Sequence, residues 1–168
     1  MKRVGTDGRA RLLVALLLLG CVACDGGSVQ RTSQFERLTG TWTASSLRVD
    51  GFDFTSPLNA TYDRLEITFT ATGEGLGSYE LRGTKDGTNT LAVRGPVQIV
   101  NDDALVLEGG FARRVFWTFE FETSRRLTLR SPADRNAGTT GFLQRVLPGQ
   151  TWGEMPDVAF RLQADEDA

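Results

Sequence analysis

The chain contains no histidine, and its two cysteines, Cys21 and Cys24, lie close together near the N-terminus. Most of the sequence therefore offers neither an imidazole nor a thiol. This excludes most zinc and copper sites, Ser-His-Asp and Cys-His nucleophile systems, and disulfide bonds within a folded domain. No calcium-loop pattern surrounds Asp102-Asp103, which we interpret as a hairpin turn. We predict no metal, no other cofactor and no enzymatic activity.

An excess of positive charge is also missing. The formal net charge of the 168 residues is -2, and residues 1–20 hold four basic side chains against one acidic one. Without that segment, 15 basic and 20 acidic side chains remain, which gives a net charge of -5. A nucleic-acid binder needs a basic face for the phosphates, so the charge argues against nucleic acid as a partner.

The N-terminal segment has the pattern of a secretion signal. Four positive charges fall within residues 2–11, and an unbroken apolar stretch follows at residues 12–20. Nine residues match the apolar region of a signal peptide and are too few to cross a bilayer as a helix. The stretch also lacks the amphipathic period of a buried core helix. We predict a signal peptide at residues 1–20.

The end of this segment, Leu18-Leu19-Gly20-Cys21, resembles a lipobox, the bacterial motif whose cysteine is acylated after cleavage. Cys24 also follows a small residue and is the alternative anchor. Several acyl chains on one cysteine give stable membrane attachment. The resemblance implies a lipoprotein of the bacterial cell envelope, with its domain outside the cytoplasm and the membrane as a partner. We predict a linker at residues 21–36, a folded domain at 37–164 and an acidic tail at 165–168.

The folded domain shows the alternating pattern of β-strands. Apolar and polar residues alternate over 65–70 and 115–122, which places one apolar face on each strand. Turn signals separate further predicted strands, at residues 41–49, 78–83, 90–93, 97–100, 104–108, 126–130 and 157–163. No sustained helical period follows Leu38, so a parallel βαβ sheet is not expected. The sequence predicts an all-β, antiparallel barrel or sandwich with two long loops at residues 50–62 and 131–156.

A three-residue motif resembles a known family. Gly40-Thr41-Trp42 opens the first predicted strand, as the Gly-x-Trp motif does in the lipocalin-like domains of envelope lipoproteins. The resemblance implies an up-and-down β-barrel, with a β-sandwich as the alternative. It also implies that Trp42 closes one end of the barrel beneath an arginine from the last strand. We assign that role to Arg161, with Arg130 as the second candidate.

Large aromatic side chains define the candidate ligand site. Phe69, Trp117, Phe119 and Phe121 lie on the apolar faces of their strands, where they would either line a cavity or fill the barrel. If they line a cavity, the domain binds a small apolar or amphipathic ligand. If they fill it, the domain is a structural or protein-interaction module, and an exposed apolar patch on the 131–156 loop would favour that alternative.

Charged residues on the strands have simpler explanations than catalysis. Glu66, Glu120 and Glu122 alternate with the apolar positions, so we interpret them as the solvated faces of their strands. Arg113-Arg114 and Arg125-Arg126 flank the most aromatic strand, and pairing across a hairpin would gather four cations at one end of the sheet. They would then receive an anionic group or, alternatively, protect a hydrophobic strand from edge pairing.

Overall fold

The computed structural model describes residues 33–132 and 134–164. The predicted signal peptide, Cys21, Cys24, most of the linker and the acidic tail lie outside these residues. Across the described ranges, no helix is both long and apolar enough to cross a membrane.

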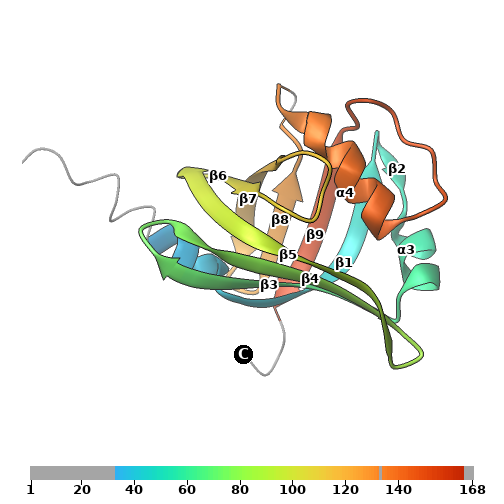
Figure 1. Cartoon of the computed structure of the whole chain (residues 1–168), viewed down its shortest axis with the longest axis horizontal. Helices are drawn as coiled ribbons and strands as arrows, with labels where there is room; N and C mark the ends of the chain where they lie inside the picture. The colour runs from blue at the N-terminus through green and yellow to red at the C-terminus, as the bar shows by residue number, and fades with distance from the viewer. Residues whose placement is uncertain (1–32, 133, 165–168) are drawn as a thin grey trace, which may run out of the picture.

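The described chain folds into a closed antiparallel β-barrel of eight strands (Figure 1). Each strand pairs with the next one along the chain, and β9 pairs with β1, for example through Phe160 opposite Leu47, to close the sheet. The short strand β2 (Phe52–Asp53) extends β1 beside the barrel. The prediction of an up-and-down barrel is confirmed, and the sandwich alternative is wrong. The barrel strands are β1 (Gly40–Val49), β3 (Arg64–Gly73), β4 (Leu76–Lys85), β5 (Thr88–Asn101), β6 (Ala104–Leu107), β7 (Val115–Thr123), β8 (Arg126–Arg130) and β9 (Val158–Ala164).

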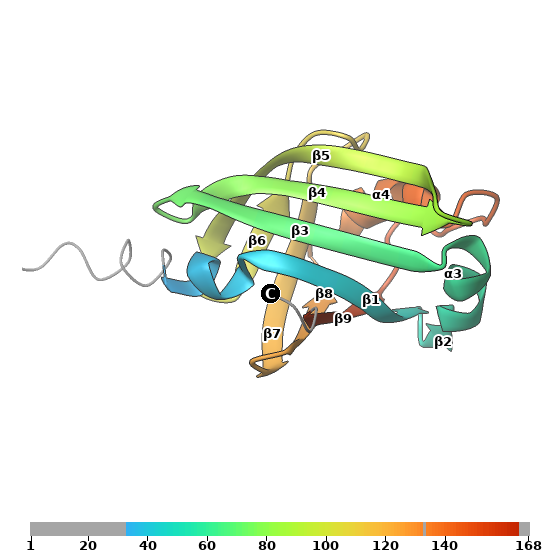
Figure 2. The ribbon, with the colours of Figure 1, turned by 90° about the horizontal axis from the view of Figure 1, so that it is seen from below.

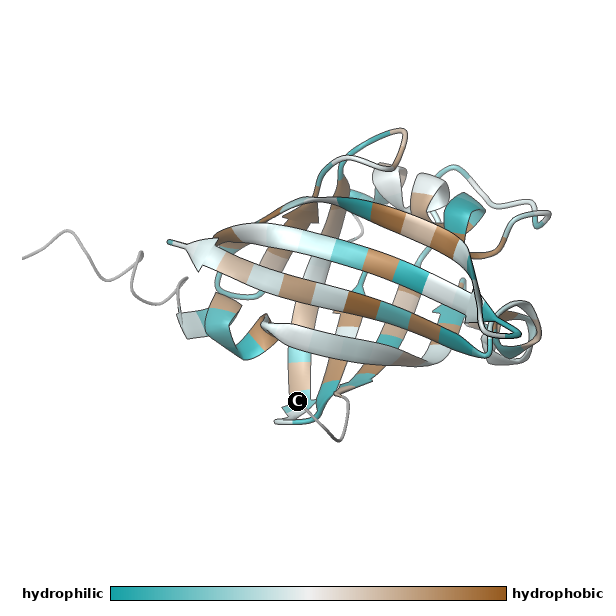
Figure 3. Cartoon of the chain, turned by 60° about the horizontal axis from the view of Figure 1, so that its bottom comes forward, coloured by the Kyte–Doolittle hydropathy of each residue, from teal (hydrophilic) through white to brown (hydrophobic). Residues whose placement is uncertain are grey.

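The core lies inside the barrel because alternate side chains of each strand point inward. Figure 3 shows brown and teal bands alternating along the strands. In β3, Leu65, Ile67 and Phe69 are buried, whereas Thr70, the next residue of the strand, is exposed. The same alternation in every long strand produces one continuous hydrophobic cluster.

Three segments differ from the sequence prediction. The strands expected at residues 90–93 and 97–100 form one strand, β5, through Gly95-Pro96. The loop expected at 50–62 contains β2 and helix α3 (Thr55–Thr61). The loop expected at 131–156 contains the 3-10 turn η1 (Asn136–Gly138) and helix α4 (Thr139–Val146). Helices of two turns are too short to give a clear apolar period, so these were missed.

Short helices cover the two ends of the barrel (Figures 1 and 2). Residues 33–38 are helical and cover the end that we call the N-terminal end, where Phe35 and Leu38 are buried. Residues 33–36 of the predicted linker therefore belong to this helix. The opposite end, which we call the α4 end, lies beneath α4, whose Phe142, Leu143 and Val146 are buried.

Two inward-facing glycines of β4 leave space for aromatic rings that belong to other segments of the chain. A Cβ atom at Gly77 would collide with the ring of Phe35, and one at Gly83 would collide with the ring of Tyr62, which follows α3. Glycine at these positions lets each ring lie directly on the strand backbone. The barrel is therefore filled at its ends by side chains from the segments that precede β1 and β3.

Candidate functional site

Trp42 lies at the N-terminal end, as the Gly-x-Trp motif predicts. Its side chain is buried, and its Nε1 donates a hydrogen bond to the Leu38 carbonyl oxygen at 2.8 Å. Its ring lies 6.0 Å from that of Phe121. Gly40 opens β1 with a φ of 127°, a conformation that L side chains rarely adopt. Trp42 thus ties the N-terminal helix to the barrel interior.

The predicted pairing of Trp42 with Arg161 is not formed. Arg161 alternates with the buried residues of β9 and points outward, where its Nε lies 3.5 Å from Glu122 Oε1. Arg130 is exposed as well. A different cation, Arg37, lies over the ring of Phe121, which contacts Trp42; its guanidinium carbon is 4.1 Å from the ring centre. It comes from the N-terminal helix, a segment for which the motif gives no signal.

The four predicted ligand-lining aromatics belong to the same hydrophobic core, but their ring contacts fall into separate groups. Phe119 and Phe121 are in edge contact at 5.9 Å, and Phe121 also contacts Trp42. Phe69 is buried opposite Gly40 and Tyr79. Trp117 instead contacts Phe142 of α4. The wall predicted as a single surface is thus divided between the two ends of the barrel.

A second aromatic cluster lies at the α4 end, with Phe142 at its centre. The Phe142 ring lies 5.1 Å from Trp117, 5.7 Å from Phe160 and 5.7 Å from Phe111. Phe111 in turn stacks on Tyr79 at 6.1 Å. Phe142 is 1% exposed and Trp117 is 0% exposed. We call these five residues the α4-end cluster, in which Phe142 occupies the mouth of the barrel.

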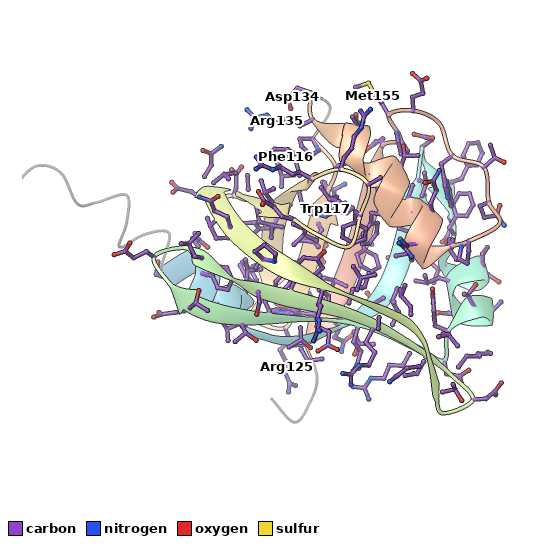
Figure 4. All side chains as sticks on the ribbon, in the orientation of Figure 1. Phe116, Trp117, Arg125, Asp134, Arg135 and Met155 are labelled. Carbon is purple, nitrogen blue, oxygen red and sulfur yellow. The ribbon has the colours of Figure 1, made fainter. Side chains whose placement is uncertain are left out.

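The two polar groups of this cluster have different surroundings. The Tyr79 hydroxyl donates to the Gly109 carbonyl oxygen at 2.6 Å, and burial raises its pKa well above the ordinary value. Trp117 Nε1 is buried and finds no hydrogen-bond acceptor among the residues that the structure describes. A buried donor without a partner costs about 1–3 kcal/mol. The Trp117 indole therefore offers an unused hydrogen bond inside the barrel (Figure 4).

Helix α4 is held on the barrel by packing. In the described ranges, no hydrogen bond joins α4 to a barrel strand. Its Thr140 hydroxyl donates to the carbonyl oxygens of Gly153 and Glu154 at 2.8 and 3.1 Å. The base of the segment is fixed by Ser131, whose hydroxyl donates to the Pro156 carbonyl oxygen at 3.1 Å. The segment is hydrogen-bonded to itself and rests on the mouth through apolar side chains.

Three hollows in the described part of the chain lie on the outer surface. One of about 450 Å³ lies beside α4 and the loop that carries Met155. Another of about 450 Å³ and a smaller one of about 240 Å³ lie on the outer face of β3 and β4, between polar side chains that include Thr68 and Glu80. The predicted interior aromatics are not part of these hollows.

The structure separates the charged residues that could have formed a catalytic or anion site. Glu66 lies on β3, whereas Glu120 and Glu122 lie on β7, which does not pair with β3. Across the described residues no group of three or more potential ligands could hold a metal ion.

The two arginine pairs also lie apart. Arg113-Arg114 precedes β7 and Arg125-Arg126 follows it, so the pairs occupy opposite ends of that strand. The four cations expected at one end of the sheet are therefore not assembled there. Figure 4 shows Arg125 on the side of the barrel away from α4 and Met155.

No family model matches this chain, and no curated protein matches it. Among solved structures, it is similar to a redesigned β-barrel, b11L5F_LGL, with 14% identity, a TM-score of 0.49, and coverage of 79% of this chain and 96% of the other. It is also similar to the redesigned β-barrel mFAP0 bound to DFHBI, with 15% identity, a TM-score of 0.43, and coverage of 76% and 98%. A third structure, EF1p2_mFAP2b bound to DFHBI, shares 13% identity at a TM-score of 0.44, with 82% of this chain and 100% of the other covered.

Proposed function

We propose that this chain is a lipoprotein of the bacterial cell envelope whose lipocalin-like barrel binds a small apolar or amphipathic molecule without catalysing a reaction. The apolar stretch at residues 12–20 and the lipobox-like sequence ending at Cys21 support the membrane anchor, with Cys24 as the alternative. The described chain begins at the N-terminal end of the barrel (Figure 2).

The unpaired Trp117 Nε1 carries the ligand proposal. It lies among aromatic rings at the α4 end, where an apolar molecule gains burial and a hydrogen-bond acceptor on that molecule gains a donor. Phe142 occupies this place in the structure. Ligand binding therefore requires Phe142 and α4 to move out of the mouth.

The attachment of α4 makes that movement feasible. The helix and residues 153 and 154 form a unit that is joined by the Thr140 hydroxyl, whose single hydrogen is shared between two carbonyl oxygens. This unit does not hydrogen-bond to the barrel strands in the described ranges. Movement of this unit away from the barrel exposes Phe142, Leu143 and Val146 to solvent but breaks no strand pairing. A ligand of similar apolar area compensates for that lost burial.

The ligand proposal is tested with two probes of nearly the same size. Acetophenone has a carbonyl acceptor and ethylbenzene has none. The full chain, with Cys21→Ser and Cys24→Ser to keep it free of lipid, is titrated with each probe by NMR. We expect acetophenone to bind about 2–10 times more tightly, because a hydrogen bond contributes about 0.5–1.5 kcal/mol.

The variant Trp117→Phe removes the donor and should abolish this preference. Trp152→Phe is the matched control, because Trp152 Nε1 is also buried without a partner in the described residues but the ring lies against Phe54. A preference that survives in Trp117→Phe, or one that disappears equally in Trp152→Phe, would refute the role of Trp117.

The alternative is an interaction module with a permanently filled barrel. The described part of the 131–156 segment exposes one large apolar side chain, Met155, which is 55% exposed and is the point at which a partner would make apolar contact under this alternative (Figure 4). Under this alternative neither probe binds inside the barrel, and shifts in the NMR titration stay away from Trp117. The titration therefore separates the two functions.

A further inference from the structure

The hollow beside α4 is a second candidate site, separate from the mouth of the barrel. It encloses about 450 Å³ between the β6–β7 loop, the η1–α4 segment and the loop before β9. Its walls differ in character, since they combine small residues, one thioether and two opposite charges. The residues that matter are Ala112, Arg113, Gly138, Gly141, Glu154 and Met155, which we call the α4 groove.

Neither charge of the α4 groove has a partner among the described residues. Arg113 has no ion pair or hydrogen bond within the described residues, whereas its neighbour Arg114 lies 2.9 Å from Glu108. The Glu154 carboxylate likewise has no partner in the part of the chain that the structure describes. Both side chains line the same hollow, and no ion pair joins them within the described residues. One wall therefore presents an available cation and another an available anion.

Hydrogen bonds fix the backbone of the wall that carries Glu154 and Met155. Thr140 donates to the Glu154 carbonyl oxygen at 3.1 Å, and Asn136 Nδ2 donates to the Met155 carbonyl oxygen at 3.1 Å. These bonds use main-chain atoms and leave both side chains available to the groove. On the opposite wall, a Cβ at Gly141 would lie 3.7 Å from the Ala112 nitrogen, so glycine widens the groove there.

From this arrangement we propose that the α4 groove binds a short zwitterionic peptide with an apolar side chain. The peptide carboxylate pairs with Arg113, whose planar guanidinium suits a carboxylate. The peptide ammonium pairs with Glu154, and the apolar side chain covers the exposed Met155. A hollow of about 450 Å³ lies within the range of small-molecule sites. This site is independent of ligand binding at the mouth.

The test uses leucyl-leucine, which is zwitterionic, and N-acetyl-leucyl-leucinamide, which carries neither charge. The isotope-labelled full chain with Cys21→Ser and Cys24→Ser is titrated with each by NMR. We expect saturable shifts at Arg113, Gly141 and Met155 with leucyl-leucine, and at least about fivefold weaker binding of the neutral analogue.

Two pairs of variants locate the charges. Arg113→Gln and Glu154→Gln should each weaken leucyl-leucine binding about fivefold and leave binding of the neutral analogue unchanged. Arg126→Gln and Glu74→Gln make the same charge changes at the other end of the barrel. They should leave the binding of leucyl-leucine and of the neutral analogue unchanged. Absence of saturable binding, equal affinity for the two peptides, shifts outside the groove, or equal effects of the control variants would each overturn the proposal.

Discussion

Replacement of Phe142 by alanine tests how much the packing of the α4-end cluster contributes to the unfolding free energy. Phe142 is 1% exposed and contacts the rings of Phe111, Trp117 and Phe160 within 5.7 Å. Loss of a buried phenyl ring costs about 3–5 kcal/mol through lost burial and the cavity left behind. Because a domain of this size loses about 3–5 °C in Tm per kcal/mol, we expect Tm to fall by roughly 9–25 °C.

Urea unfolding followed by circular dichroism measures this change in the lipid-free full chain. The control is Phe52→Ala, because Phe52 is 72% exposed and should change the unfolding free energy by no more than about 0.5 kcal/mol. A cost below about 1 kcal/mol for Phe142→Ala would refute the packing described for α4.

The same variant should be rescued by a ligand. The vacated space is lined by aromatic rings and by Trp117 Nε1, so acetophenone should occupy it. At ten times its Kd, a ligand that binds only the folded state adds about 1.4 kcal/mol to the unfolding free energy. Acetophenone should therefore raise the Tm of Phe142→Ala by several degrees, and ethylbenzene by less. If neither probe raises it, α4 has collapsed into the space and no site remains.

Three further predictions concern other parts of the chain. Gly77→Ala should lower the unfolding free energy by about 1–3 kcal/mol in urea unfolding, because its Cβ meets the Thr70 carbonyl oxygen and the Phe35 ring. Gly153→Ala faces open space and should be neutral. The unfolding free energy should fall as the pH rises above about 10. Tyr79 ionises at its ordinary pKa in the unfolded chain, whereas burial raises its pKa and keeps it protonated in the folded chain. Tyr79→Phe should reduce this loss of stability in unfolding experiments across that pH range. Cys21→Ser should abolish incorporation of an alkyne fatty acid, and persistent labelling would move the anchor to Cys24.

The barrel could be predicted from the sequence because the alternation of apolar and polar residues that defines its strands is a local pattern. The alternation in β3 and β7 indicates which side chains face inward, and the Gly-x-Trp motif predicts that Trp42 lies at one end of the barrel. Continuity of β5 through Gly95-Pro96 could not be predicted from turn propensity alone. In the structure the Pro96 carbonyl oxygen accepts from Glu108 N at 3.0 Å, so neighbouring strands hold the dipeptide extended.

The candidate site was harder to predict because it depends on contacts between distant segments. Trp117 and Phe142 are 25 residues apart, and neither the short α4 nor its single inward ring gives a periodic signal. The outward direction of Arg161 follows from its alternation with Phe160 and Leu162, which the sequence does contain. Glycine at the inward positions 77 and 83 of β4 was the sequence feature that could have indicated that rings from other segments pack on this strand near the barrel ends.

Native mass spectrometry of the lipid-free full chain, purified from the cells that express it, tests the ligand-binding account most directly. The account predicts one small molecule bound per chain in repeated preparations, and a clear loss of that molecule in Trp117→Phe but not in Trp152→Phe. Repeated preparations without a bound molecule, together with no acetophenone binding in either the unaltered barrel or Phe142→Ala, would contradict it.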